Sequence, residues 1–219
     1  MRAMILAAGR GERMRPLTDT LPKPLLEVGG KALIVWHIEN LARNGFTEVI
    51  INIAHLGYKI PEYLGDGSKW GIDITYSDEQ QSGALESAGG IIKALPLLAD
   101  EPFLVLNADI FCAYEYDAAF VLGDTLAHLI LVPNPPHNEK GDFGIDGDLV
   151  LNAADIMYTF SGIGYYHPKL FAHQKLQKSP LAPLLREFVD KGLVSGSLFN
   201  KMWHDIGTPQ RLQQINETL

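Results

Sequence analysis

The stretch that decides the fold is residues 5–33, ILAAGRGERMRPLTDTLPKPLLEVGGKAL. It begins as the end of a buried strand and then continues as a long loop with closely spaced glycines and prolines. Loops of this length are uncommon inside compact domains, where they are usually functional or disordered. A disordered tether would lack the apolar anchors found here at Leu17, Leu21, Leu25, Leu26 and Val28. We therefore expect an ordered loop that binds something.

Outward from this loop, short apolar runs alternate with helical patterns. We expect strands near 2–8, 48–54, 73–78, 102–109 and 127–133, and helices near 31–45, 58–64, 87–98 and 115–122. Such alternation is typical of an α/β, Rossmann-like fold with a mostly parallel sheet and helices on both faces.

The residue composition changes at residues 133–152, PNPPHNEKGDFGIDGDLVLN, where Pro, Gly, Asn and Asp are frequent. Such turn residues predict an irregular loop and a β-hairpin. A strand at 160–168, an amphipathic helix at 181–192 and a short strand at 201–207 follow. Thr208 and Pro209 are typical of the N-cap and first turn of a final helix. We interpret residues 1–219 as a single domain with a small inserted β lobe near 134–166.

Composition narrows the function classes. The 219 residues carry a formal net charge of −8, which disfavours general binding to nucleic acid or to an anionic membrane. The single cysteine, Cys112, excludes an internal disulfide and fits a reducing compartment as a small core residue. No apolar run approaches the length of a membrane span. We expect a cytoplasmic protein, and the sequence leaves its oligomeric state unknown.

The long loop after the first strand has residues suited to binding an anion. Small residues at 7–9 and at Gly11 let backbone N–H groups approach an anion or a base edge. Its basic side chains (Arg10, Arg13, Arg15, Lys23) concentrate positive charge in an acidic protein. The prolines at 16, 22 and 24 fix φ and predict an extended loop without helix. A dinucleotide fingerprint is disfavoured, because its third glycine would fall on Met14.

The full segment LAAGRGERMRPLTDTLPKPL (6–25) resembles the signature of the sugar-1-phosphate nucleotidyltransferases, which make nucleotide sugars from a nucleoside triphosphate and a sugar 1-phosphate. The likeness continues through LNADIF (106–111) and WHDIGTPQRL (203–212), so it spans nearly the whole chain. It implies a nucleotide site that includes Leu6, Ala8, Gly9, Gly11, Glu12 and Arg13. It also implies catalytic roles for Arg13, Lys23 and Asp109. Position 12 is commonly small in this family, so Glu12 must point away or shift the usual contacts.

The resemblance also implies that Asp109 and Asp205 hold Mg²⁺ at the reacting phosphates. Mg²⁺ accepts one or two protein carboxylates completed by phosphate oxygens and water. Because Thr208 already serves as a cap, we expect Asp205 to be free for this task.

Base recognition is implied in residues 77–91, SDEQQSGALESAGGI, where backbone near Gly83 would read the base and Ser87 would cap a helix. Gly89 and Gly90 would let that helix pack closely, and Asn107 fits a ribose contact. A pyrimidine, uridylate first, is the expected base. Gln80–Ser82 leaves open a side chain that reads guanine instead.

For the sugar, the implied residues are Gly144, Asn152, Thr159 and Gly162. The Glu-Lys pair that many relatives carry in this lobe is absent between Asn152 and Thr159. Chain length and the FSGI segment (160–163) resemble the short bacterial N-acetylmuramate-1-phosphate uridylyltransferases of cell-wall recycling. The alternatives are a hexose-1-phosphate thymidylyl- or guanylyltransferase and a catalytically silent regulatory module that binds nucleotide sugar.

Overall fold

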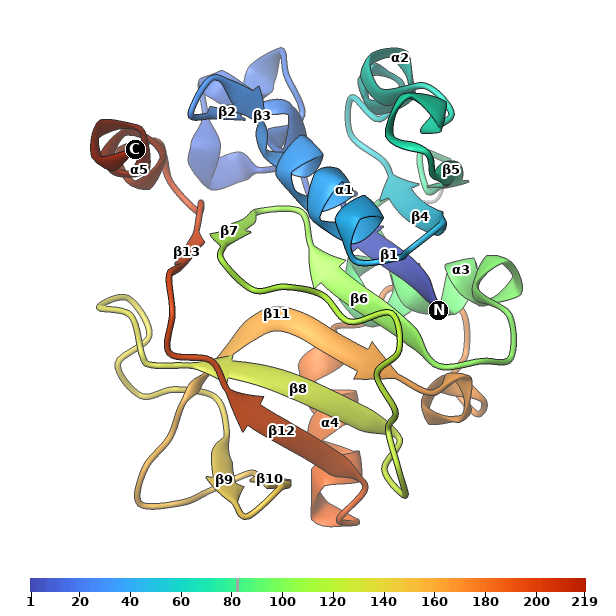
Figure 1. Ribbon diagram of the computed structural model, residues 1–219, viewed down its shortest axis with the longest axis vertical. Helices are drawn as coiled ribbons and strands as arrows, with labels where there is room; N and C mark the ends of the chain where they lie inside the picture. The colour runs from blue at the N-terminus through green and yellow to red at the C-terminus, as the bar shows by residue number, and fades with distance from the viewer. Residues whose placement is uncertain (82) are drawn as a thin grey trace.

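The computed structural model describes residues 1–81 and 83–219, which form one nine-stranded sheet between helices (Figure 1). The strand order is β5-β4-β1-β6-β11-β8-β12-β10-β9. This arrangement confirms the predicted α/β fold with a mostly parallel sheet.

The first half of the sheet is parallel throughout. It contains β1 (Arg2–Leu6), β4 (Glu48–Ile53), β5 (Asp73–Asp78) and β6 (Phe103–Asn107). Helices α1 (Leu33–Arg43) and α2 (Lys59–Leu64) cover one face, and α3 (Glu86–Leu98) covers the other. In this half the elements match the predicted ones closely.

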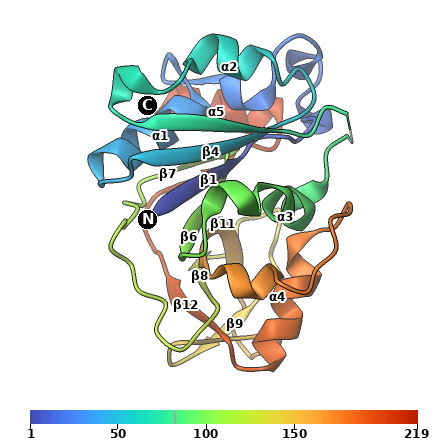
Figure 2. The ribbon, with the colours of Figure 1, turned by 90° about the vertical axis from the view of Figure 1, so that its right-hand side faces the viewer.

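The second half is mixed. Strand β11 (Thr159–Tyr166) runs antiparallel between β6 and β8 (Ala127–Val132) and so joins the halves into one sheet. Beyond β8 lie β12 (Val194–Leu198), β10 (Leu149–Leu151) and β9 (Gly144–Asp146). Helix α4 (Leu181–Asp190) packs on the same side as α3, as Figure 2 shows.

Smaller elements frame the carboxyl ends of the parallel strands. Two short antiparallel pairs form, one from β2 (Glu27–Val28) and β3 (Lys31–Ala32), the other from β7 (Ile110–Cys112) and β13 (Trp203–Asp205). The last helix, α5 (Pro209–Thr218), follows β13, and its Thr208 cap accepts a hydrogen bond from Arg211 N at 3.4 Å as predicted. Among the 3₁₀ turns, η4 (Ser68–Trp70) precedes β5 and η5 (Pro168–Phe171) follows β11.

Strand β1 shows how the core is divided. Ile5 packs with α1 residues such as Ile34 and Ile38, whereas Met4 packs with Ile91 of α3 on the opposite face. Alternate strand residues point to opposite faces, so an apolar run can serve two helical layers. Each such side chain contributes about 1.5–3 kcal/mol by leaving water.

Two local predictions are wrong. Residues 115–122 form no helix, because Asp117 N donates to the Tyr165 hydroxyl at 2.9 Å and Ala119 N donates to Asp117 Oδ1 at 2.8 Å. These bonds build a turn in place of a helical ladder. Ser87 is not the cap of α3 either, since Leu85 holds that position and Ser87 Oγ instead accepts from Leu181 N at 3.0 Å.

Within the described residues, no helix has both the length and the apolar character needed to cross a bilayer.

Candidate active site

The long loop is ordered and curled. Three 3₁₀ turns shape it, η1 (Glu12–Met14), η2 (Leu17–Asp19) and η3 (Lys23–Leu25), so the expectation of an extended loop is wrong. Met14 and Leu25 are buried beneath it. Thr18 is 1% exposed and its hydroxyl donates to Gly11 O at 2.8 Å, which pins the second turn to the first.

Gly11 is required by this curl. Its φ is +62°, and a Cβ there would lie 2.9 Å from Thr18 Cγ2. The left-handed conformation and the close contact both favour glycine. At Gly11 the loop therefore has only backbone to offer a ligand.

A cavity of about 290 Å³ opens at the carboxyl ends of β1 and β6. Its lining includes Leu6, Ala8 and Gly9 on one side, Asn107 and Asp109 on another, and Ala84 and Ser87 at the start of α3. Ligands of open α/β sheets bind at this edge of the strands. Of the residues predicted to contact the base and ribose, Leu6, Ala8, Gly9 and Asn107 line this cavity. Gly83 does not line it but precedes the lining residue Ala84. Of the Gln80–Ser82 segment, Ser82 lies outside the described residues.

A buried polar chain starts at Ala7 and Asn52, two residues that line this cavity. Ala7 N donates to Asn52 Oδ1 at 2.7 Å, Asn52 Nδ2 donates to Glu79 Oε1 at 2.8 Å, and Leu85 N donates to Glu79 Oε2 at 2.8 Å. This chain ties the ends of three strands to α3. A Cβ on Gly90 would lie 2.7 Å from Asn52 Nδ2, which confirms the close packing predicted there.

Sequence reasoning missed Asn52 and Glu79. A signal was available for Asn52, because it interrupts the apolar run of β4. Buried polar groups are costly unless they are hydrogen-bonded, so an amide in such a run indicates a specific partner.

A second cavity of about 310 Å³ shares Gly9, Lys23 and Asp109 with the first. It is also lined by Gly11, Glu12, Arg13, Met14 and Gly207. Lys23 Nζ lies 2.6 Å from Asp109 Oδ2, and the Lys23 side chain is only 11% exposed. Glu12 is exposed at the rim of this cavity. The predicted phosphate-binding cations and one predicted carboxylate therefore border the same space.

Backbone pairing of β7 with β13 places the two predicted metal-binding aspartates on adjacent segments, but Asp109 lines the cavities around Lys23 and Asp205 lines another cavity of about 530 Å³. Asp205 of β13 pairs with Ile110 of β7, and Ile206 N donates to Asp109 O at 2.7 Å. Hard carboxylate oxygens from two neighbouring chain segments are a donor set that suits Mg²⁺ when phosphate oxygens and water complete it. Among the described residues, no group of three or more His, Cys, Asp or Glu side chains could hold a metal ion by itself.

Asp205 is not free, contrary to expectation. Arg211 Nη1 contacts its Oδ2, and His137 Nε2 lies 2.9 Å from its Oδ1. Neither partner was predicted. The signal for Arg211 was its place one turn into the helix after the WHDIG segment (203–207), where its side chain can reach back toward the strand.

Two of the four predicted sugar-binding residues, Gly144 and Gly162, are glycines in close packing contacts. Gly162 lies against Asn107, the residue predicted to contact the ribose, since a Cβ on Gly162 would lie 2.5 Å from Asn107 Nδ2. Its φ of +81° also favours glycine. Gly144 packs against Ala154, with 2.4 Å between a placed Cβ and the Ala154 Cβ. Neither Gly144 nor Gly162 supplies a side chain, so any contact from them would come from backbone.

Thr159 and Asn152 are engaged elsewhere. Thr159 is buried, and its hydroxyl donates to Asn134 Oδ1 at 2.9 Å. Asn152 Nδ2 donates to Asp190 Oδ1 at 2.7 Å and to Arg186 O at 2.9 Å on α4. Neither residue lines the cavities around Lys23 and Asp109.

Behind β7 lies a buried titratable pair. His37 Nδ1 and the Tyr116 hydroxyl are 2.8 Å apart, and burial lowers the pKa of His37 to about 4. Burial also raises the pKa of Cys112 to about 11, so this side chain stays a neutral thiol at pH 7, in line with the predicted packing role. These groups support the strand that follows Asp109.

Comparison with known proteins decides the family. The sequence pattern of the nucleotidyl transferase family matches residues 2–146. The chain belongs to this family. An N-acetylmuramate alpha-1-phosphate uridylyltransferase of Neisseria meningitidis serogroup B is 50% identical, over 98% of this chain and 96% of that protein. A protein of the same description from Caulobacter vibrioides is 30% identical, over 95% and 92% of the two chains.

The fold agrees with this assignment. A crystal structure described as a putative glucose-1-phosphate thymidylyltransferase from Bacillus anthracis, in complex with sucrose, superposes with a TM-score of 0.86 at 21% identity. It covers 100% of this chain and 94% of that one. The resemblance to the sugar-1-phosphate nucleotidyltransferases is confirmed, and the chain is an enzyme of that kind.

Proposed function

We propose that this enzyme transfers UMP from UTP to N-acetylmuramate 1-phosphate, releasing pyrophosphate and forming a nucleotide sugar. The observation that carries the proposal is the convergence of Arg13, Lys23 and Asp109 on one cavity that continues into the cavity beside Leu6 and Asn107. The 50% identity to a uridylyltransferase for this sugar supports the choice of substrates.

The lining of the two cavities supports part of the proposed nucleotide contacts, and the roles of Gly11 at the base and of Gly83 come from the family resemblance. Backbone groups of Leu6 to Gly11 cradle the base and ribose, with Asn107 at the ribose. Arg13 holds the triphosphate, and Lys23 meets the phosphates where they react. The base edge is read by backbone near Gly83, which favours a small pyrimidine ring.

Charge explains the proposed need for Mg²⁺. A triphosphate near −4 and a sugar phosphate near −2 bring about −6, against which Arg13 and Lys23 supply only about +2. Bound Mg²⁺ would neutralise phosphate charge in the transition state. Asp109 and Asp205 are the residues that would hold it.

The reaction needs no nucleophilic side chain. The sugar phosphate is already an anion at neutral pH, so its oxygen can attack the α-phosphorus directly as pyrophosphate leaves. Arg13 and Lys23 then act by alignment and by balancing charge. A cytoplasmic location and a role in peptidoglycan recycling remain predictions.

The test is a matrix of initial rates of pyrophosphate release with UTP, dTTP, ATP and GTP. Each is paired with N-acetylmuramate, N-acetylglucosamine, glucose and mannose 1-phosphates. We expect UTP with N-acetylmuramate 1-phosphate to be the best pair. GTP with mannose 1-phosphate as the best pair would overturn base and sugar but keep the reaction class.

A further inference from the structure

Both carboxylates of the proposed metal site are already engaged by basic side chains. Lys23 Nζ lies 2.6 Å from Asp109 Oδ2. On Asp205, Arg211 contacts one oxygen and His137 Nε2 lies 2.9 Å from the other. The partners of Asp205 come from different directions, Arg211 from α5 and His137 from the segment after β8.

The charges at this place are balanced without a metal. Lys23 and Arg211 match the two carboxylates, and the positive charge of Arg13 is matched by the negative charge of Glu12, a carboxylate at the rim of the same cavity. Both guanidinium groups flank Gly207, where a Cβ would lie 2.9 Å from Arg211 Nη1 and 3.6 Å from Arg13 Nη2. A free divalent cation therefore meets no net negative charge here. A nucleoside triphosphate near −4 reverses that balance.

The Arg211 contact is built into the fold. Thr208 caps α5 and accepts from Arg211 N, so the helix start fixes where the Arg211 side chain begins. The Arg211 and Asp205 side chains are 24% and 23% exposed, which limits screening of the pair by solvent. Arg211 lines the cavity of about 530 Å³, but Gly207 lines the cavity of Arg13 and Lys23, and a Cβ placed on Gly207 would lie 2.9 Å from Arg211 Nη1. Phosphates in the cavity of Arg13 and Lys23 could thus draw the Arg211 guanidinium away from Asp205.

We propose that Arg211 and His137 are positioning residues that hold Asp205 closed to a free divalent cation, and that the triphosphate opens the site by giving Arg211 and Lys23 new anionic partners. The metal then enters together with the nucleotide. This inference rests on the proposed metal-binding roles of Asp109 and Asp205. It adds an order of binding. It also assigns roles to His137, which lies outside the segments that carry the resemblance, and to Arg211, which lies within the segment 203–212 but had no predicted role.

The test uses Mn²⁺ as the probe and electron paramagnetic resonance of free Mn²⁺ as the readout, with no nucleotide present. Four proteins form a cycle, namely the natural chain, Arg211→Gln, Asp205→Asn and the double variant. We expect Arg211→Gln to bind Mn²⁺ at least about tenfold more tightly than the natural chain, a change of about 1.4 kcal/mol. The double variant should lose that gain.

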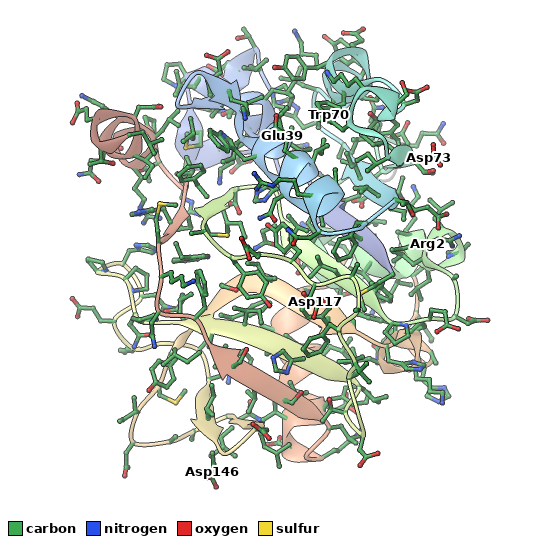
Figure 3. The ribbon with its side chains drawn as sticks, viewed as in Figure 1. Arg2, Glu39, Trp70, Asp73, Asp117 and Asp146 are labelled. Atoms are coloured by element: carbon green, nitrogen blue, oxygen red, sulfur yellow. The ribbon has the colours of Figure 1, made fainter. Side chains whose placement is uncertain are left out.

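Arg2→Gln is the matched control. Arg2 also makes an ion pair, with Glu48 at 2.8 Å, and its substitution removes the same charge. It lies on the side of the molecule away from α5 (Figure 3). Its Mn²⁺ affinity should equal that of the natural chain.

His137→Ala keeps the test decisive if Arg211→Gln does not fold, which thermal melting would show. It frees only one oxygen of Asp205, so we expect a smaller gain of about threefold. Water-proton relaxation with UTP distinguishes Mn²⁺ bound to protein and nucleotide from Mn²⁺ on nucleotide alone. With UTP present, the Mn²⁺ affinities of the natural chain and of Arg211→Gln should differ less than they do without UTP.

Two results overturn the inference. One is a folded Arg211→Gln protein, or a folded His137→Ala protein in its place, that binds Mn²⁺ as the natural chain does. The other is a gain that survives Asp205→Asn. Failure of the proposed function would look different, because no pair in the rate matrix would release pyrophosphate. The Mn²⁺ measurements on free protein would still decide the role of Arg211.

Discussion

The two halves of the sheet differ in how they use their predicted site residues. In the half built on β1, β4 and β6, most of the predicted residues border two cavities that share Gly9, Lys23 and Asp109, and the contacts they offer come mainly from backbone and from Lys23 and Arg13. In the half built on β8, β9 and β10, the polar side chains of Thr159 and Asn152 are bonded within the protein. We call the first half, with β1, β4 and β6, the nucleotide half, and the second, with β8, β9 and β10, the acceptor half, after their proposed roles. The cavities of the nucleotide half are open to a ligand, whereas the side chains of Thr159 and Asn152 in the acceptor half are already hydrogen-bonded.

The difference teaches where sequence motifs are informative. Parallel strands deliver their carboxyl ends to one edge, so residues just after β1 and β6 must lie close together. No comparable constraint applies to the 134–166 lobe, where a polar residue in a turn can serve the turn itself. We therefore expect substitutions in the nucleotide half to change chemistry and those in the acceptor half to change stability.

The largest effect is expected from Asp109→Asn and Asp205→Asn. Each removes a charged oxygen ligand from the proposed metal, so turnover should fall by about a hundredfold to a thousandfold. Steady-state pyrophosphate release at saturating Mg²⁺ measures it, with circular dichroism as the check on folding. Near-normal turnover in either variant would break the assignment of the nucleotide half.

Lys23→Ala should come next. If Lys23 meets the reacting phosphates mainly in the transition state, its loss costs about 3 kcal/mol, or roughly a hundredfold in turnover. Arg13→Ala should instead weaken triphosphate binding, which calorimetry separates from the rate. Unchanged turnover with lost binding in the Lys23 variant would show that the two roles are reversed.

Particular residues show what the sequence could and could not reveal about the fold and site. Met4 and Ile5 sit in a continuous apolar run, and such a run bounded by glycine predicts a doubly buried strand. Strand β12 was missed because VSGSL (194–198) has little apolar periodicity and forms by pairing in parallel with β8. The helix expected at 115–122 failed because Asp117 and Tyr165, far apart in sequence, form a bond that fixes a turn.

Prediction of the site from the sequence was likewise limited by contacts between distant segments. Asp109 and Asp205 could be named from their segments, yet only the pairing of β7 with β13 brings them together. Arg211 lies six residues after Asp205, so its place in the helix was a usable local signal, whereas His137 comes from a distant segment and carries none. Partners across the fold are set by tertiary structure, which residue spacing does not encode.

Acid should destabilise the nucleotide half through His37. Its pKa is lowered from 6.5 to about 4 by burial, so the unfolded chain binds the proton more readily than the folded one. The stability is present above pH 6.5 and is lost as the pH falls toward 4, by about 3 kcal/mol in total. Urea unfolding at pH 7 and pH 5 should show a shallower pH dependence in His37→Gln than in the natural chain.

His128 in the acceptor half is the comparison for this test. Burial lowers its pKa too, but its two ring nitrogens lie 2.9 Å and 3.0 Å from the hydroxyls of Ser195 and Ser197. Because it is only partly buried, a proton on its ring stays closer to water. His128→Gln should flatten the pH dependence less than His37→Gln, and the reverse order would place the acid sensitivity in the acceptor half.

The smallest effect is expected from Asn152→Ala. Asn152 bonds to Arg186 O and Asp190 at the surface of α4, so its loss should cost about 1 kcal/mol of unfolding free energy. The KM for N-acetylmuramate 1-phosphate should stay within about twofold of the natural value, because that change corresponds to only about 0.4 kcal/mol of binding. Asp190→Asn, which weakens the same contact from the helix side, should give a similar stability loss. If Asn152→Ala raises KM about tenfold while Asp190→Asn does not, the Asn152 side chain leaves α4 to bind the sugar. The acceptor half would then resemble the nucleotide half in presenting its predicted residues to substrate.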